Sequence, residues 1–190
     1  MSKFDAQKYH RRTIRLKGYD YSQPGTYFIT LVTLQREPLF GEIVNSEMRL
    51  NPLGKLVEKC WLTISIHFPL ARLEEFVIMP NHLHGIILLC TGEAFAGNAF
   101  ILPINPKPAD ASPQPPIRTK SGSLGAIIQN FKSVGTRLAN SRYFNPGNTL
   151  WQRNYYDHII RNEAELTRIR QYIRTNPLQW EIDQENPIHP

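Results

Sequence analysis

Two histidines separated by one residue, His82 and His84, open an apolar run in this 190-residue sequence. A second apolar run, residues 76–79, lies just before them, and the dipeptide Pro80-Asn81 between the two runs is a turn signal. Because side chains alternate across a β-strand, we expect both imidazoles on one face of the second strand. Ligands rooted at a strand end beside a tight turn are held rigidly, so this hairpin predicts a metal site.

A phenol and an amide near the end of the chain form the second half of the candidate site. Asn162 fits a helix N-cap and Pro177 cannot follow within a helix, so we expect a helix over about 163–176. Tyr172 and Asn176 lie four residues apart on it and share one face. The phenol and the amide oxygen can therefore meet one ligand.

The elements that must position these groups follow from the spacing of apolar residues. The order strand, helix, strand, strand, helix, strand predicts an α+β, ferredoxin-like antiparallel sheet with two crossover helices on one face. The tyrosine-bearing helix and the histidine pair then share the other face. We expect strands over 26–34, 39–44 (an edge hairpin), 72–79, 82–90 and 149–152, and helices from Asn51 to near His67 and over 121–140.

The length predicts a single domain over residues 1–190. Its first 25 residues form a basic arm, and the proline-rich residues 91–119 are expected to be an insertion in the domain rather than a boundary between domains. The formal net charge of +6 favours a polyanionic partner, with nucleic acid as the leading candidate. No run approaches the length of a membrane span, so we expect a cytoplasmic, nucleoid-associated bacterial protein.

Three segments in the same order resemble the transposase family that uses one tyrosine and an HUH histidine pair. They are residues 79–84 (MPNHLH), 156–161 (YDHIIR) and 172–177 (YIRTNP). The sequence is most similar to the branch of REP-associated tyrosine transposases. The resemblance also takes in residues 12–21 and the helix over 124–132, and so covers most of the chain outside the proline-rich segment.

The resemblance implies cleavage of single-stranded DNA in which a tyrosine attacks the phosphodiester and forms a 5′-phosphotyrosine link. Tyr172 matches the nucleophile, and His82 and His84 match the metal-binding pair. Asn176 matches a third polar ligand four residues after the tyrosine. The family points to Mg²⁺ or Mn²⁺ as cofactor, and two imidazoles with one amide make Mn²⁺ the compromise.

His158 and its neighbours leave two assignments open. Structural support of the site is the preferred role of His158, and contact with metal or substrate is the alternative. Tyr155 or Tyr156, directly before it in the sequence, could be the nucleophile in place of Tyr172.

The expected partner is single-stranded or hairpin DNA, bound by a monomer or a loose homodimer. The hairpin stem would be held through its backbone, with adjacent single strand at the cleft. Basic side chains are candidates for phosphate contacts, and two tyrosines could stack on unpaired bases. These candidates are Arg11, Arg12, Arg15, Lys17, Lys132, Arg153, Arg161, Arg168 and Arg174, with Tyr19 and Tyr21.

Two other functions compete with DNA transesterification. A ferredoxin-like sheet can be a non-catalytic nucleic-acid-binding module, although the glycine-aromatic pattern of RNA-recognition motifs is missing from this sequence. A histidine pair can also activate water in a metal hydrolase, which would turn over without a protein–DNA adduct.

Overall fold

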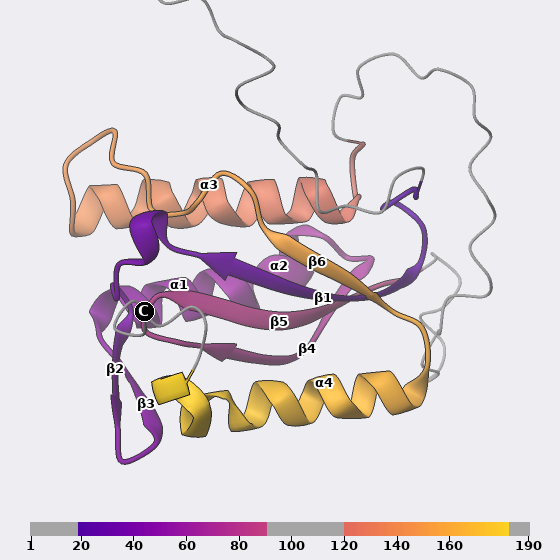
Figure 1. The fold of residues 1–190 in the computed structure, drawn as a ribbon. Helices are drawn as coiled ribbons and strands as arrows, with labels where there is room; N and C mark the ends of the chain where they lie inside the picture. The colour runs from indigo at the N-terminus through magenta and orange to yellow at the C-terminus, as the bar shows by residue number, and fades with distance from the viewer. Residues whose placement is uncertain (1–18, 91–119, 183–190) are drawn as a thin grey trace, which may run out of the picture.

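The computed structural model describes residues 19–90 and 120–182, so the arm up to residue 18 and the proline-rich segment 91–119 lie outside the described residues. A four-stranded antiparallel sheet with strand order β4-β5-β1-β6 organises the chain (Figure 1). The expected ferredoxin-like α+β fold is confirmed. Its strands are β1 (Gly25–Val32), β4 (Ala71–Ile78), β5 (His82–Leu89) and β6 (Tyr156–Ile160), and its helices are α1 (Pro52–Leu62), α2 (Ile64–His67), α3 (Leu124–Arg142) and α4 (Glu163–Thr175).

Strand β1 lies inside the sheet and sets the register of the site. It pairs with β5 from Gly25↔Leu89 to Val32↔His82, and with β6 on its other side. Seven of its eight residues are buried, because helices cover both faces of the sheet. Its β-branched and aromatic residues suit such a position.

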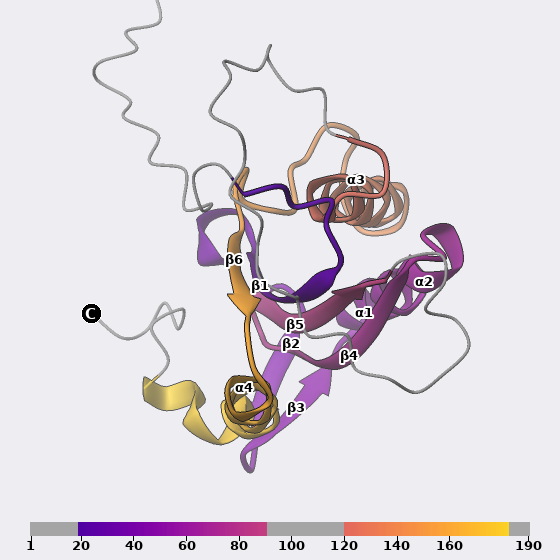
Figure 2. The same ribbon diagram turned by 90° about the vertical axis from the view of Figure 1, so that its right-hand side faces the viewer.

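The two faces of the sheet carry separate apolar clusters. Helices α1 and α3 cover one face and α4 lies on the opposite face, as Figure 2 shows. The larger cluster, on the α1 and α3 side, holds the rings of Tyr27, Phe40, Trp61, Phe131 and Trp151. The smaller cluster, under α4, consists of the buried residues Phe28, Ile86, Ile160, Leu166 and Ile173.

The first helix is shorter than the sequence indicates. Its N-terminus is as expected, because the side chain of Asn51 accepts a hydrogen bond from the backbone N–H of Gly54. The expected continuous helix to His67 is wrong, because α1 ends at Leu62 and α2 begins at Ile64. The hydroxyl of Thr63 donates to the carbonyl oxygen of Cys60 at this break, which is the local competition with helix bonding that threonine side chains offer.

The fourth strand is not where the sequence placed it. Within residues 149–152, Trp151 makes only an isolated bridge to Thr33, and the strand at the sheet edge is β6. Trp151 is buried between Phe40 and Phe131, at ring-centroid distances of 5.3 and 5.5 Å. The ring of Trp151 packs in the core, so this β-like segment does not form a strand of the sheet. His158 lies on β6.

The expected edge hairpin is a separate two-stranded sheet of β2 (Gly41–Val44) and β3 (Glu47–Leu50). Within the described residues there are also two short 3₁₀ helices, η1 over Leu34–Arg36 and η3 over Asn176–Ile182. Helix α4 therefore ends before Pro177, and the chain continues as a 3₁₀ helix. No helix within the described ranges is both long and apolar enough to cross a membrane.

Two glycines provide a matched test of this packing. A Cβ atom at Gly85 on β5 would lie 2.4 Å from Cζ2 of Trp61, whereas one at Gly135 on α3 would meet nothing closer than 3.7 Å. We expect Gly85→Ala to lower the free energy of unfolding by about 1–3 kcal/mol through overpacking. Gly135→Ala should raise it by about 0.5–1 kcal/mol, because alanine favours a helix interior. Urea unfolding measures both, and equal effects would contradict this packing.

Candidate functional site

The histidine pair opens β5 on the face that α4 covers. His82 is fully buried, His84 is 4% exposed, and their ring centroids are 4.5 Å apart. The alternation of β5 places Ile86, a member of the cluster under α4, on this same face. The expectation that both imidazoles share the face opposite the crossover helices agrees with the geometry.

The side chain of Asn81 fixes the proton on His82. Nδ2 of Asn81 donates to the carbonyl oxygen of Arg36 at 3.0 Å, so Oδ1 faces Nδ1 of His82 at 2.8 Å. An amide oxygen can only accept a hydrogen bond, so Nδ1 of His82 carries the proton. In the neutral ring the lone pair then lies on Nε2, the tautomer that can bind a cation through this atom.

A hydrogen bond from the neighbouring strand holds the imidazole of His84. Its Nδ1 lies 2.8 Å from the hydroxyl oxygen of Thr30, its cross-strand partner on β1. Burial, and next the nearby His82, hold the pKa of His84 well below its ordinary value. The imidazole is therefore neutral at neutral pH and keeps a lone pair.

The phenol of Tyr172 reaches the histidine pair from α4. Its hydroxyl oxygen lies 3.2 Å from Nε2 of His84, and the two rings are 5.2 Å apart between centroids. Phe28 of β1 stacks on His84 at 5.4 Å and meets Tyr172 edge-on at 6.1 Å. Tyr172 is 39% exposed, so its phenol is open to solvent while the histidines beneath it are buried.

In the sequence, Asn176 lies midway between Tyr172 and Trp180, whose rings lie near the histidine pair. It follows Tyr172, which contacts His84, by four residues, and it precedes Trp180 by four; the ring of Trp180 lies 6.0 Å from that of His82. Asn176 is fully buried, and neither polar atom of its side chain has a hydrogen-bond partner within the described residues. Buried polar groups nearly always have a partner, so this amide has hydrogen-bonding capacity left for a water molecule or a ligand.

Two imidazole nitrogens and one amide oxygen make a donor set that fits a divalent cation with open coordination positions. Residues 19–90 and 120–182 contain no cluster of three or more histidine, cysteine, aspartate or glutamate side chains that could hold a metal by themselves. The amide of Asn176, the third ligand that the resemblance implies, would add an oxygen donor to the pair, and this assignment stays a prediction. Water or substrate oxygens would supply the remaining ligands.

His158 contacts the start of the helix that carries Tyr172. Its Nε2 is 2.7 Å from Oε1 of Glu165, and the backbone N–H of Arg161 donates to Oε2 of the same carboxylate. The side chain of Asn162 accepts from the backbone N–H of Glu165 and caps α4. These contacts join the start of α4 to β6, and therefore bear on the position of Tyr172.

Ion pairs to β4 hold the rest of α4. Arg170 pairs with Glu74 and with Glu163, and Arg174 pairs with Glu75. Arg174, an expected phosphate contact, is therefore engaged with a carboxylate of the sheet.

The other expected DNA contacts are distributed over the molecule. Arg11, Arg12, Arg15 and Lys17 lie outside the described residues. Tyr19 and Tyr21 pack with Tyr27 at centroid distances of 6.4 and 6.0 Å and belong to the rim of the larger core cluster. Arg153, Arg161 and Arg168 are exposed, whereas Lys132 donates to backbone carbonyl oxygens.

Sequence reasoning missed three side chains that orient the site: Asn81, Thr30 and Glu165. Asn81 was interpreted only as a turn residue, although its place next to His82 could have suggested a hydrogen bond. The pairing of Thr30 with His84 depends on strand register, which no local pattern indicates. Glu165 lies in the helix expected over about 163–176, but the sequence assigns it no contact with His158.

Comparisons with known proteins give one close relative and a shared fold. No protein-family model matches the chain. An uncharacterized protein of Haemophilus influenzae (strain KW20 / Rd) is 45% identical over 185 residues, which is 96% of this chain and 97% of that protein. Among solved structures, a REP-associated tyrosine transposase bound to a REP hairpin has a TM-score of 0.52 at 18% identity, covering 94% of this chain and 74% of that one. The two chains therefore share a fold.

Glu165 offers a test of how α4 is held. Burial raises the pKa of this carboxyl, but the hydrogen bonds from Arg161 and His158 outweigh it, and the pKa lies below its ordinary value of 4.5. We expect Glu165→Ala to lower the free energy of unfolding by about 1 kcal/mol at neutral pH, as loss of a helix-start hydrogen bond does.

A lowered carboxyl pKa in the folded state adds stability above about pH 4.5 that is lost as the pH falls below that value. The difference between wild type and Glu165→Gln should therefore shrink as the pH is lowered from 7 to 3. Urea unfolding across this range measures it. A difference that stays constant with pH contradicts the role given to the carboxylate.

Proposed function

This chain belongs to the same family as the uncharacterized Haemophilus influenzae protein, and we propose that it is a metal-dependent single-stranded DNA endonuclease and strand transferase. One observation carries the proposal: the phenol of Tyr172 lies 3.2 Å from Nε2 of His84, beside a second buried imidazole. A partly exposed phenol next to two buried imidazoles supports a phosphodiester transesterification in which a cation assists the nucleophile.

In the proposed reaction the hydroxyl oxygen of Tyr172 attacks a phosphorus atom of the DNA backbone. A bond forms between the phenolic oxygen and phosphorus, and the bond from phosphorus to the 3′ oxygen breaks. The phenol loses its proton and the departing 3′ oxygen gains one, which leaves a 5′-phosphotyrosine and a free 3′-OH. The number of phosphoester bonds is unchanged, so the step can reverse onto another strand.

The residues of the site have separate roles in this proposal. His82, His84 and Asn176 would hold Mg²⁺ or Mn²⁺, and Tyr172 would attack. A phenol has a pKa of about 10, so attack at neutral pH needs assistance. The cation would supply it by offsetting negative charge on the phenolic and phosphoryl oxygens. Phe28 packs on both His84 and Tyr172 and keeps their rings in contact.

Hairpin DNA with adjacent single strand is the proposed substrate. The net charge of +6 suits a polyanion, and the transposase that shares this fold was solved bound to a REP hairpin. The likeness to that transposase supports the choice of substrate through the fold, and the site residues support the choice of reaction.

Replacement of Tyr172 by phenylalanine tests the reaction. The variant lacks the hydroxyl oxygen but keeps the ring that packs on Phe28. We expect the wild-type protein, incubated with Mn²⁺ and a single-stranded oligonucleotide containing a REP hairpin, to form an adduct that survives a denaturing gel. Tyr172→Phe should reduce adduct formation about 10³-fold or more.

Tyr156→Phe is the matched control. Tyr156 is also partly exposed and also meets Phe28 edge-on, at 6.2 Å. Its replacement by phenylalanine therefore removes a hydroxyl from a similar environment. This variant should form the adduct at the wild-type rate. Adducts in Tyr172→Phe contradict the assignment, strand cleavage without any adduct indicates a metal hydrolase, and binding without cleavage indicates a non-catalytic module.

The role of Asn81 can be measured without DNA. Asn81→Ala removes the acceptor that keeps the proton of His82 on Nδ1, so we expect the affinity for Mn²⁺ to fall about 10–100-fold. Asn81→Asp keeps an acceptor oxygen and should bind Mn²⁺ more tightly than the alanine variant. Isothermal titration calorimetry on folded variants measures both affinities, and wild-type affinity in Asn81→Ala would show that His82 does not need this hydrogen bond.

A further inference from the structure

One segment of the chain carries basic residues without any acidic residue. Residues 120–156 contain no aspartate or glutamate, although they carry several basic side chains. This segment comprises α3 and the loop that follows it up to β6, and it lies on the face of the sheet opposite α4 (Figure 1). The basic residues are Lys120, Lys132, Arg137, Arg142 and Arg153.

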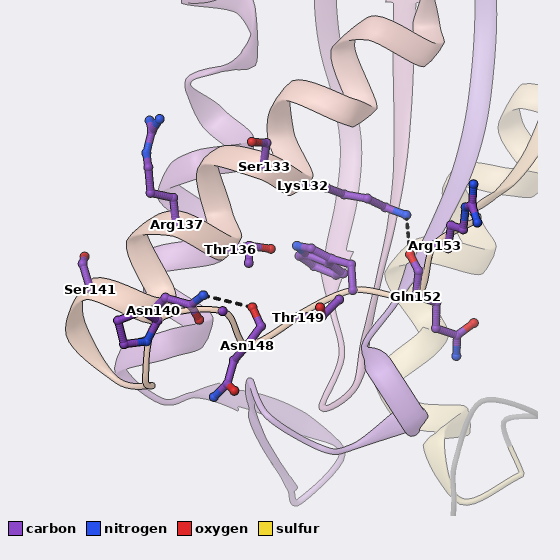
Figure 3. Close-up of a pocket in the computed structure, with 13 residues that line it drawn as sticks. Lys132, Ser133, Thr136, Arg137, Asn140, Ser141, Asn148, Thr149, Gln152 and Arg153 are labelled. Carbon is purple, nitrogen blue, oxygen red and sulfur yellow. Dashed lines mark hydrogen bonds between the residues drawn. The ribbon is translucent and has the colours of Figure 1, made fainter. Parts of the chain in front are cut away.

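A groove of about 700 Å³ lies within this cationic segment, between α3 and the loop over residues 146–153 (Figure 3). Its lining contains no acidic side chain. Figure 3 shows Arg137 on the helix wall and Arg153 on the loop wall, and both are exposed. Hydroxyl and amide side chains between them include Ser133, Thr136 and Asn148.

The two walls of the groove are joined by hydrogen bonds. Nζ of Lys132 donates to the carbonyl oxygens of Gln152 and Asn154, at 2.8 Å each, and Nδ2 of Asn140 donates to the carbonyl oxygen of Asn148 at 2.9 Å. Burial lowers the pKa of Lys132 to about 8, which leaves its ammonium mostly charged at neutral pH. Lys132 therefore holds the groove together, and the guanidinium groups are the cations that an anion can reach.

We propose that this groove binds the phosphate backbone of double-stranded DNA, namely the stem of the hairpin substrate, and the inference rests on the function proposed above. Arginine suits phosphate because its planar donors match the phosphate oxygens, and serine, threonine and asparagine add neutral donors. Sites for single strands instead offer exposed aromatic rings on which bases stack. The aromatic residue in this lining, Trp151, is 3% exposed, so the groove favours a backbone over unstacked bases.

The groove and the tyrosine are connected around one edge of the sheet. Arg153 precedes β6 by three residues, and β6 is an edge strand. Tyr156, the first residue of β6, is 43% exposed and packs on Phe28, which also meets Tyr172. A duplex on the α3 face can thus send its single-stranded extension past β6 to the phenol on the other face.

Removal of the two guanidinium groups tests the proposal. The probe is a fluorescent hairpin oligonucleotide with a single-stranded extension, titrated in EDTA to prevent cleavage and followed by anisotropy at several salt concentrations. We expect Arg137→Gln/Arg153→Gln to weaken hairpin binding about tenfold at physiological salt and to lower the slope of log K against log salt by about two. Ser133→Glu, which adds a carboxylate to the groove, should also weaken binding.

The matched control removes the same charge elsewhere. Arg49 and Lys55 are exposed residues outside the groove, so Arg49→Gln/Lys55→Gln should bind the hairpin more tightly than the groove variant. The groove variant should still form the Tyr172 adduct on a stemless single strand. Wild-type hairpin affinity in the groove variant, or an equal loss in the control, overturns the inference. Groove-dependent binding without any adduct overturns the proposed reaction and leaves the groove assignment intact.

Discussion

The candidate site depends on the packing of α4 across the sheet face that carries the histidines. His82 and His84 are fixed by their own strand and its neighbours, but Tyr172 reaches them only because α4 lies over β5 and β1. The apolar part of this contact is small, since the helix contributes two fully buried residues, Leu166 and Ile173, and the partly buried Ile169 to the cluster beneath it. Burial of two such side chains is worth about 3–6 kcal/mol.

Polar contacts add orientation to this apolar contact more than they add stability. The pairs that join Arg170 and Arg174 to β4 are partly exposed, and exposed ion pairs contribute about 0–1 kcal/mol each. Together with the Glu165 contacts at the helix start, they fix the rotation of α4 about its own axis. This rotation decides whether the phenol faces the imidazoles, so weak contacts far from the reacting atoms determine the geometry of the site.

The sequence predicts those parts of the fold that strong local periodicity encodes. Alternation along β5 placed both histidines on one face, and the N-cap at Asn162 placed the start of the helix that carries Tyr172. Local patterns failed where tertiary packing decides. Trp151 lies in a β-like segment but is drawn into the core, while Asp157 and His158 interrupt the apolar pattern that would have marked β6. The orienting bonds of Asn81 and Thr30 depend on strand register and turn geometry, which a single sequence does not display.

The distribution of charge differs between the two faces of the molecule. On the α4 face, Arg170 and Arg174 are matched by carboxylates of β4, and His84 is neutral. These side chains therefore offer little net positive charge to a phosphate at the phenol, and a bound cation would have to supply what the reaction needs there. On the α3 face, arginines lie in a stretch that has no acidic residue. In the proposed function the α3 face would attract the duplex, whereas the phosphate at the phenol would depend on a bound cation.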